Sequence, residues 1–240
     1  MSVRILAMDS TAVAASSAVV EDEKILAESY SNVRLTHSQT LMPMVESMLR
    51  CAEIPLESID LFAVNAGPGS FTGVRIGVAA VKGLGVGTGK PCVGTSTLEA
   101  LAFHTQCYPD AVICPVMDAR CAQVYNALFR WENGQLIRLC EDRAIAAAQL
   151  EQELKNEKCV ILLGDGAQMC YNSFTSNAFV LAPEQIRYQR ASGVAAAARE
   201  AFARGESVDG CQLMPTYLRL PQAERELKKR NEKAAEGNLR

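Results

Sequence analysis

The stretch Ile-Leu-Ala-Met-Asp at residues 5–9 has a counterpart in Val-Ile-Cys-Pro-Val-Met-Asp at residues 112–118. Each is a continuous apolar run that ends in an aspartate, which is typical of a buried strand whose polar end opens onto a turn. In both halves two further extended segments, a helical segment, another strand and another helix follow in the same order. The sequence therefore predicts an internal duplication.

The duplication predicts an α/β fold of two ribonuclease H-like lobes, each with a mixed sheet flanked by helices. This is the plan of the actin-like ATPase and sugar kinase superfold, in which a cleft separates the lobes. We expect residues 1–105, completed by 192–220, to form the first lobe and residues 106–191 the second. Asp9 and Asp118 end the two equivalent strands and are predicted to face the cleft, unless they only start or cap turns.

Composition narrows the function classes. The 240 residues are 49% hydrophobic and 21% charged, which is typical of a soluble globular protein. The formal net charge of -3 provides no positive field for a phosphate backbone, so direct binding of nucleic acid is not expected. No run approaches the roughly 18 apolar residues of a membrane span, and the apolar run near the N-terminus is too short for a signal peptide, which favours the cytoplasm.

Cysteine and histidine usage argues against redox and metal chemistry. The nine cysteines lack any Cys-x-x-Cys pair, which a zinc ribbon or a thioredoxin-like motif would require, so we interpret them as buried thiols. Only two histidines exist, His37 and His104, and a histidine-rich metal site is therefore excluded.

A glycine-rich block, Gly67 to Gly73, follows a predicted strand and opens a predicted helix. Its backbone N–H groups could bind an anion, or its glycines could merely permit a tight turn and close packing. Interior helical glycines such as Gly73 and Gly77 each cost about 1 kcal/mol relative to alanine, so a close neighbour is expected, either inside the fold or across a subunit interface. The Met-rich helical segment 41–49 leaves the same choice open.

Several motifs together resemble the TsaB (YeaZ) family. They are Ile5 to Thr11, His37-Ser38-Gln39, Ala66 to Gly77 (Ala-Gly-Pro-Gly-Ser-Phe-Thr-Gly-Val-Arg-Ile-Gly), Gly94 to Leu98, Met117 to Arg120, and Pro215 to Arg219. The resemblance implies a non-catalytic subunit of the bacterial machinery that makes N6-threonylcarbamoyladenosine (t6A) at position 37 of tRNAs reading ANN codons.

The same resemblance implies the partners. They are TsaD, a paralogue that transfers the threonylcarbamoyl group, and the ATPase TsaE, with tRNA reached only through the complex and a homodimer formed in isolation. ATP and a divalent metal would belong to the partner subunits, and no cofactor is expected on this chain. In TsaD a His-x-x-x-His helix binds the catalytic metal, whereas Thr97 and Leu101 stand at the matching positions here.

Two sets of site residues follow from the resemblance. The first is a vestigial, weak nucleotide site at Asp9, Asp118, Gly164 and Gly166, because Gly164-Asp165-Gly166 only thinly matches the glycine loops of active relatives. The second is a partner interface at Leu41, Met42, Val45, Met48, Gly73, Gly77 and Val81. The charged tail 221–240 falls outside the resemblance. The alternatives are an active enzyme of the same fold, such as a small-molecule kinase or the transferase itself, and a metallopeptidase-like protein.

Overall fold

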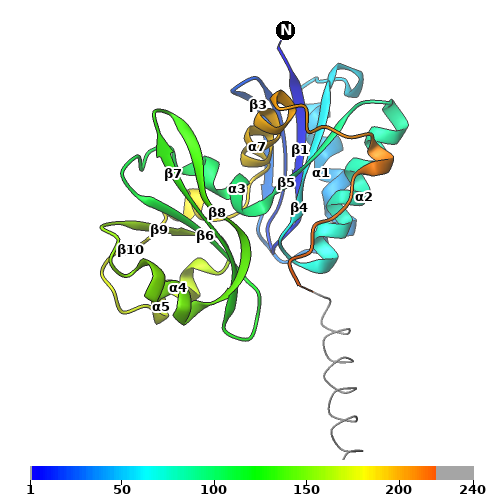
Figure 1. The fold of residues 1–240 in the computed structure, drawn as a ribbon. Helices are drawn as coiled ribbons and strands as arrows, with labels where there is room; N and C mark the ends of the chain where they lie inside the picture. Colours follow the sequence, from blue (N-terminus) through cyan, green and yellow to red (C-terminus); the bar gives the residue numbers. More distant parts are fainter. Residues whose placement is uncertain (1, 220–240) are drawn as a thin grey trace, which may run out of the picture.

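The first half of the chain forms a five-stranded mixed sheet in the order β3-β2-β1-β4-β5 (Figure 1). The computed structural model describes residues 2–219. In this sheet β1 is central, pairs antiparallel with β2 and runs parallel to β4. The strands are β1 (Arg4–Asp9), β2 (Ala15–Glu21), β3 (Lys24–Ser31), β4 (Leu61–Gly67) and β5 (Cys92–Ser96).

The second half repeats this topology in the order β10-β9-β6-β7-β8. Here β6 is central, antiparallel to β7 and parallel to β9, so it occupies the place that β1 has in the first sheet. The strands are β6 (Val112–Asp118), β7 (Gln123–Glu132), β8 (Gln135–Ala146), β9 (Val160–Leu163) and β10 (Phe179–Leu181). The predicted duplication and the predicted fold class are confirmed.

Helices cover both faces of the first sheet. Helices α1 (His37–Cys51) and α2 (Phe71–Thr88) bury apolar side chains against one face. Helix α7 (Ala191–Ala203) covers the other face, where it contacts β1, β2, β4 and β5. A segment that follows the second sheet in sequence thus returns to complete the first lobe, which is formed by this sheet with α1, α2 and α7.

The second sheet is covered by α4 (Ala147–Leu154) and α5 (Ala167–Ser173) on one face. Its other face packs against the short helix α3 (Thr97–Ala102), whose Leu98 and Leu101 join the core of this second lobe. Because Ala100 of α3 belongs to the core of the first lobe, α3 lies between the two sheets. The remaining elements are α6 (Glu184–Arg187) and the short 3₁₀ turns Leu56–Ser58, Phe103–Thr105 and Gly210–Gln212.

Candidate functional site

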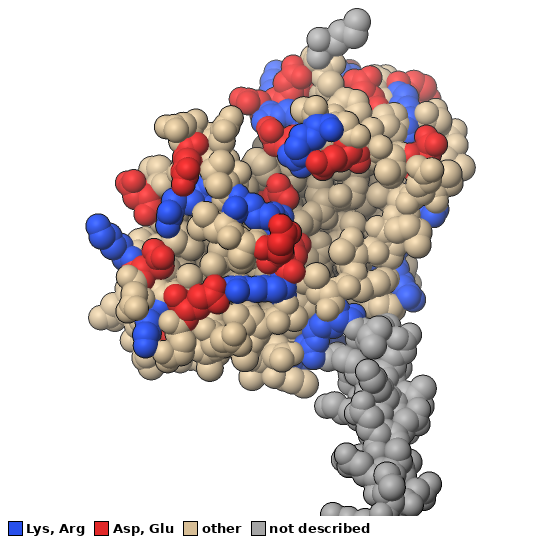
Figure 2. Space-filling view, in the orientation of Figure 1, with Lys and Arg blue, Asp and Glu red and all other residues tan. Residues whose placement is uncertain are grey.

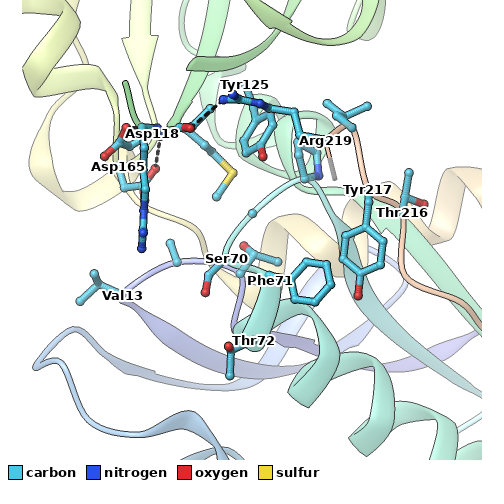
Figure 3. A pocket seen from close by; sticks show the side chains of 18 residues that line it. Val13, Ser70, Phe71, Thr72, Asp118, Tyr125, Asp165, Thr216, Tyr217 and Arg219 are labelled. Carbon is cyan, nitrogen blue, oxygen red and sulfur yellow. Dashed lines mark hydrogen bonds between the residues drawn. The ribbon is translucent and has the colours of Figure 1, made fainter. Parts of the chain in front are cut away.

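A cavity of about 470 Å³ lies between the lobes, where the carboxyl ends of β1 and β6 face each other (Figure 3). Both lobes and the C-terminal segment contribute to it, so it is the cleft that the fold class predicts. Its lining comes from Thr11 to Val13, Pro68 to Thr72, Met117 to Arg120, Tyr125, Asp165 and Thr216 to Arg219.

Two aspartates of the second lobe line this cleft. The backbone N–H of Asp118 donates to Oδ1 of Asp165 at 3.2 Å, and the N–H of Arg120 donates to Oδ1 of Asp118 at 2.7 Å. Burial raises the pKa of Asp165 to about 6, and the negative charges of Asp118 and Asp9 add to this. Asp165 is absent from the site residues predicted from the sequence, although it stands between Gly164 and Gly166, which are among them.

Gly164 and Gly166 do not line the cleft, which corrects their assignment as nucleotide-binding residues. A Cβ on Gly164 would stand 2.2 Å from the carbonyl oxygen of Val116, and its φ of +100° also favours glycine. A Cβ on Gly166 would stand 3.1 Å from the backbone nitrogen of Asp118. Both glycines therefore let this turn approach β6, and they act on the cleft only by placing Asp165.

Asp9 is fully buried and does not line the cleft either, in contrast to the prediction from its place at a strand end. Its carboxylate accepts hydrogen bonds from Nδ2 of Asn65 and from the N–H of Thr11, the latter at 3.1 Å. Burial raises its pKa, while the bonds from Asn65 and Thr11 oppose that rise. Asp9 thus holds the ends of β1 and β4 together beneath the cleft.

The glycines in the first half of α2 pack against the end of β1 inside the first lobe. A Cβ on Gly73 would stand 2.0 Å from the carbonyl oxygen of Ser10, and one on Gly77 would stand 2.7 Å from Oγ of Ser10. The Ser70 hydroxyl caps α2 by accepting a hydrogen bond from the N–H of Gly73 at 3.4 Å. Of the two possibilities left open by the sequence, close approach within the fold is therefore the one observed for these glycines.

The predicted partner interface needs the same correction. Leu41, Val45, Met48, Gly73, Gly77 and Val81 are all buried beneath α1 and α2, where they face the first sheet and cannot touch another chain directly. Of the predicted set only Met42 is exposed, at 40%. The outward face of α2 instead carries Arg75, Ala79, Gly83 and Val86. The structure thus places all the predicted interface residues except Met42 inside the first lobe, and partner binding by α1 and α2 stays a prediction.

An aromatic stack fixes the C-terminal segment to α2, and nothing in the spacing of the sequence indicated it. The rings of Phe71 and Tyr217 lie 4.5 Å apart, and the guanidinium of Arg75 lies 3.9 Å from the centre of the Phe71 ring. Arg75 Nε also donates to the Tyr217 hydroxyl at 2.8 Å. Two residues after Tyr217, Nη1 of Arg219 donates to the carbonyl oxygen of Ala119 in the second lobe at 2.9 Å.

Among residues 2–219 no group of three His, Cys, Asp or Glu side chains is placed to hold a metal ion. Thr97 and Leu101, which the resemblance matches to a His-x-x-x-His pair, are buried in α3.

Figure 2 shows Lys and Arg side chains interspersed with Asp and Glu on the visible face. In the same described range, every helix is too short or too polar to cross a bilayer.

Comparisons with known proteins relate the chain to tRNA threonylcarbamoyladenosine biosynthesis. Residues 24–227 match the family model described as TsaD, tRNA N6-adenosine threonylcarbamoyltransferase. The "tRNA threonylcarbamoyladenosine biosynthesis protein TsaB" of Bacillus subtilis is 32% identical, with 92% of this chain and 96% of that protein covered. The Escherichia coli protein of the same description is 30% identical, with 90% and 94% covered. The crystal structure of YeaZ from Pseudomonas aeruginosa superposes with a TM-score of 0.76 at 26% identity, covering 90% of this chain and all of that one.

Proposed function

Because the chain belongs to the TsaB (YeaZ) family of tRNA threonylcarbamoyladenosine biosynthesis proteins, we propose that it is the non-catalytic subunit that binds and activates TsaD. In this proposal TsaD, joined by TsaE, transfers the threonylcarbamoyl group to adenosine 37 of tRNAs reading ANN codons in the cytoplasm. ATP and a divalent metal are held by those partner subunits, and tRNA meets this chain only within the complex.

The outward face of α2 is the observation that carries the proposal. A Cβ on Gly83 would meet nothing within 4 Å, and Ala79 is also exposed, so a second helix can approach this surface closely. Val86 is 61% exposed on the same face, and Met42 adds apolar surface on the neighbouring α1. Exposed apolar side chains around small residues are suited to a protein partner. We refer to Met42, Ala79, Gly83 and Val86 as the docking face.

A homodimer through the docking face is the competing state in this proposal. The same surface on two copies can pair about a two-fold axis, and TsaD would then have to displace the second copy. The apparent affinity for TsaD is therefore expected to fall as the concentration of this chain rises.

Gly83→Arg tests the docking face. The arginine adds a long charged side chain to the surface without entering the core, so we expect a cooperatively folded protein whose association with TsaD is lost. Met169→Arg, on the exposed surface of α5 in the second lobe, is the matched control and should bind TsaD normally. Isothermal titration calorimetry with purified TsaD measures both, and t6A formation by the reconstituted proteins should fail only with Gly83→Arg. Normal binding by a folded Gly83→Arg protein would contradict the proposal.

An active enzyme of the same fold is the second candidate, and the cleft with Asp118 and Asp165 is the observation in its favour. The alternatives separate in one assay. If the chain is a scaffold, the purified protein alone transfers no threonylcarbamoyl group, and adding TsaD and TsaE restores transfer. Metal-dependent turnover by this chain alone that is abolished by Asp118→Ala would favour the enzyme.

A further inference from the structure

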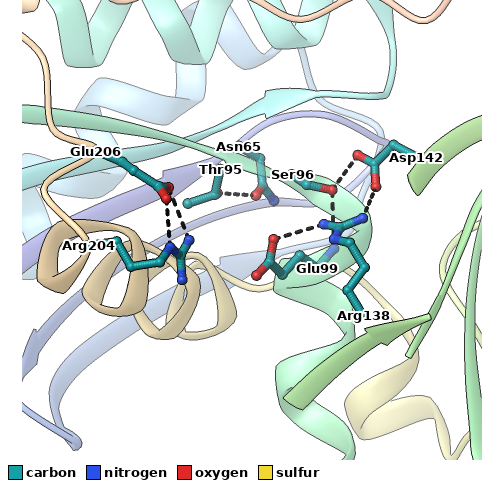
Figure 4. A network of polar contacts seen from close by, with 8 residues as sticks. All are labelled: Asn65, Thr95, Ser96, Glu99, Arg138, Asp142, Arg204 and Glu206. Atoms are coloured by element: carbon teal, nitrogen blue, oxygen red, sulfur yellow. Dashed lines mark hydrogen bonds and ion pairs between the residues drawn. The ribbon is translucent and has the colours of Figure 1, made fainter. Parts of the chain in front are cut away.

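A closed ring of hydrogen bonds joins the two lobes at the start of α3 (Figure 4). Oγ of Ser96, the residue that caps α3, accepts from the N–H of Glu99 at 3.3 Å and donates to Oδ2 of Asp142 at 2.5 Å. Nη1 of Arg138 donates to Oδ1 of Asp142 at 2.6 Å, and its Nη2 donates to Oε2 of Glu99 at 2.8 Å. We refer to Ser96, Glu99, Arg138 and Asp142 as the interlobe ring.

The interlobe ring is partly shielded from solvent. The side chains of Arg138, Glu99 and Asp142 are 25%, 26% and 18% exposed. The guanidinium of Arg138 also lies 4.7 Å from the centre of the Phe129 ring, which fixes its plane. Ion pairs that are partly withdrawn from water are screened less by salt than surface pairs, and removing Arg138 leaves the carboxylates of Glu99 and Asp142 without a counter-charge.

The ring continues into a buried polar line of the first lobe. Thr95, directly before Ser96, donates through its hydroxyl to Oδ1 of Asn65 at 2.8 Å, and Nδ2 of Asn65 donates to Asp9. These three side chains are buried at the ends of β5, β4 and β1. The floor beneath the cleft is thereby connected, through adjacent residues of one strand, to β8 of the second lobe.

Because α3 lies between the two lobes, the interlobe ring can resist rotation of one lobe against the other. Leu98 and Leu101 pack into the second lobe, while Ala100 packs into the first, so both cores share this short helix. The ring ties the first turn of α3 to β8, since Ser96 and Glu99 belong to that turn. With α3 held in this way, rotation of one lobe against the other has to break the ring.

We propose that the interlobe ring fixes the angle between the two lobes, and with it the width of the cleft, with Arg138 as its positioning residue. Arg138 is the cation of the ring and donates to the carboxylates of both Glu99 in the first half and Asp142 in its own strand, so its loss opens the ring at two points. The ring acts within a single chain, and this inference does not depend on the proposed partner.

Distances between spin labels test the proposal. One label replaces Ser47 on the exposed side of α1 and the other replaces Met169 on α5, both introduced as noncanonical amino acids because the chain has nine cysteines. Dilution with unlabelled protein removes distances between copies. We expect one narrow distance distribution in the wild type and at least a twofold broader one in Arg138→Met, which keeps the apolar stem of the side chain.

Arg4→Met is the matched control, because Arg4 forms an ion pair of similar exposure with Glu21 inside the first lobe. Its distribution should keep the width of the wild type. If Arg138→Met does not fold, Asp142→Asn opens the ring more mildly and should broaden the distribution in the same direction. An unchanged width in the folded ring variants, or equal broadening in Arg4→Met, would overturn the proposal.

Discussion

Asp165 is a residue whose burial should reduce stability at neutral pH. In the folded chain its pKa is raised to about 6, from an ordinary value of 3.8. Between these values the folded state binds more protons than the unfolded state, so its contribution to stability is greatest below about pH 4 and is lost as the pH rises through 6. Asp165→Asn keeps an acceptor for the N–H of Asp118 and removes this dependence.

We therefore expect Asp165→Asn to raise the free energy of unfolding at pH 7 by at most about 3 kcal/mol, since one pKa unit corresponds to about 1.4 kcal/mol. The gain over wild type should shrink to nothing near pH 4. Urea denaturation of both proteins from pH 4 to 7 measures the difference. A variant less stable than wild type at pH 7 would mean that the ionised carboxylate is held favourably in the cleft.

The comparison with wild type at each pH is needed because the titration of His104 changes the stability with pH in the opposite direction. Burial lowers the pKa of His104 to about 4, so the unfolded state binds the extra proton and stability rises with pH from about 4 to 6.5. The two contributions partly cancel in the wild-type curve. Only the difference in stability between variant and wild type isolates the contribution of Asp165.

At the scale of the element, α2 has two glycine-bearing faces with opposite requirements. Gly73→Ala would place a methyl group 2.0 Å from the carbonyl oxygen of Ser10, and we expect a loss of stability of about 2 kcal/mol or more. Gly83→Ala meets nothing within 4 Å and should stabilise the helix by about 1 kcal/mol. Urea denaturation of the two single variants checks both signs, and a stabilised Gly73→Ala protein would refute the packing described for this face.

This helix also illustrates what could be predicted from the sequence. Glycines in a helix indicated a close neighbour, and the spacing of Gly73 and Gly77 placed them on one face. Gly83 and Ala79 form a second small-residue face, and local spacing cannot tell which face meets the sheet. That choice depends on how α2 is seated against β1, where the Ser10 hydroxyl donates to the carbonyl oxygen of Gly73 across 63 residues of sequence.

At the scale of the whole molecule, the two sheets could be predicted because each is built from local runs that repeat along the chain. The contacts between the lobes could not be predicted from the sequence. Arg138 reaches Glu99 across 39 residues and Arg219 reaches Ala119 across 100, and such pairs leave no periodic pattern in the sequence. The prediction that Asp9 faces the cleft was wrong for a related reason. The sequence shows that Asp9 ends a strand, but it does not show that Asn65, 56 residues away, covers its carboxylate.

The charge of the whole molecule leads to a prediction about tRNA. The net charge is -3, and many arginines of the described lobes are already paired with carboxylates. These include Arg4, Arg138, Arg143, Arg190, Arg199 and Arg204. Because the net charge is negative and these arginines already have carboxylate partners, we expect the isolated chain to bind tRNA with an affinity of about 10 μM or weaker at physiological salt.

Fluorescence anisotropy with labelled tRNA at several salt concentrations measures this affinity and its salt dependence. Residues 221–240 contain six Lys or Arg and four Glu and lie outside the described residues, so their contribution is tested by substitution. A variant with Lys228, Lys229 and Arg230 changed to Gln should bind tRNA as weakly as the wild type if the folded lobes and the tail both lack a phosphate site.

Submicromolar binding that falls steeply with salt would contradict this expectation. Loss of such binding in the triple variant would assign it to the tail, and its persistence would assign it to the lobes, because only a cluster of unpaired cations produces a steep salt dependence.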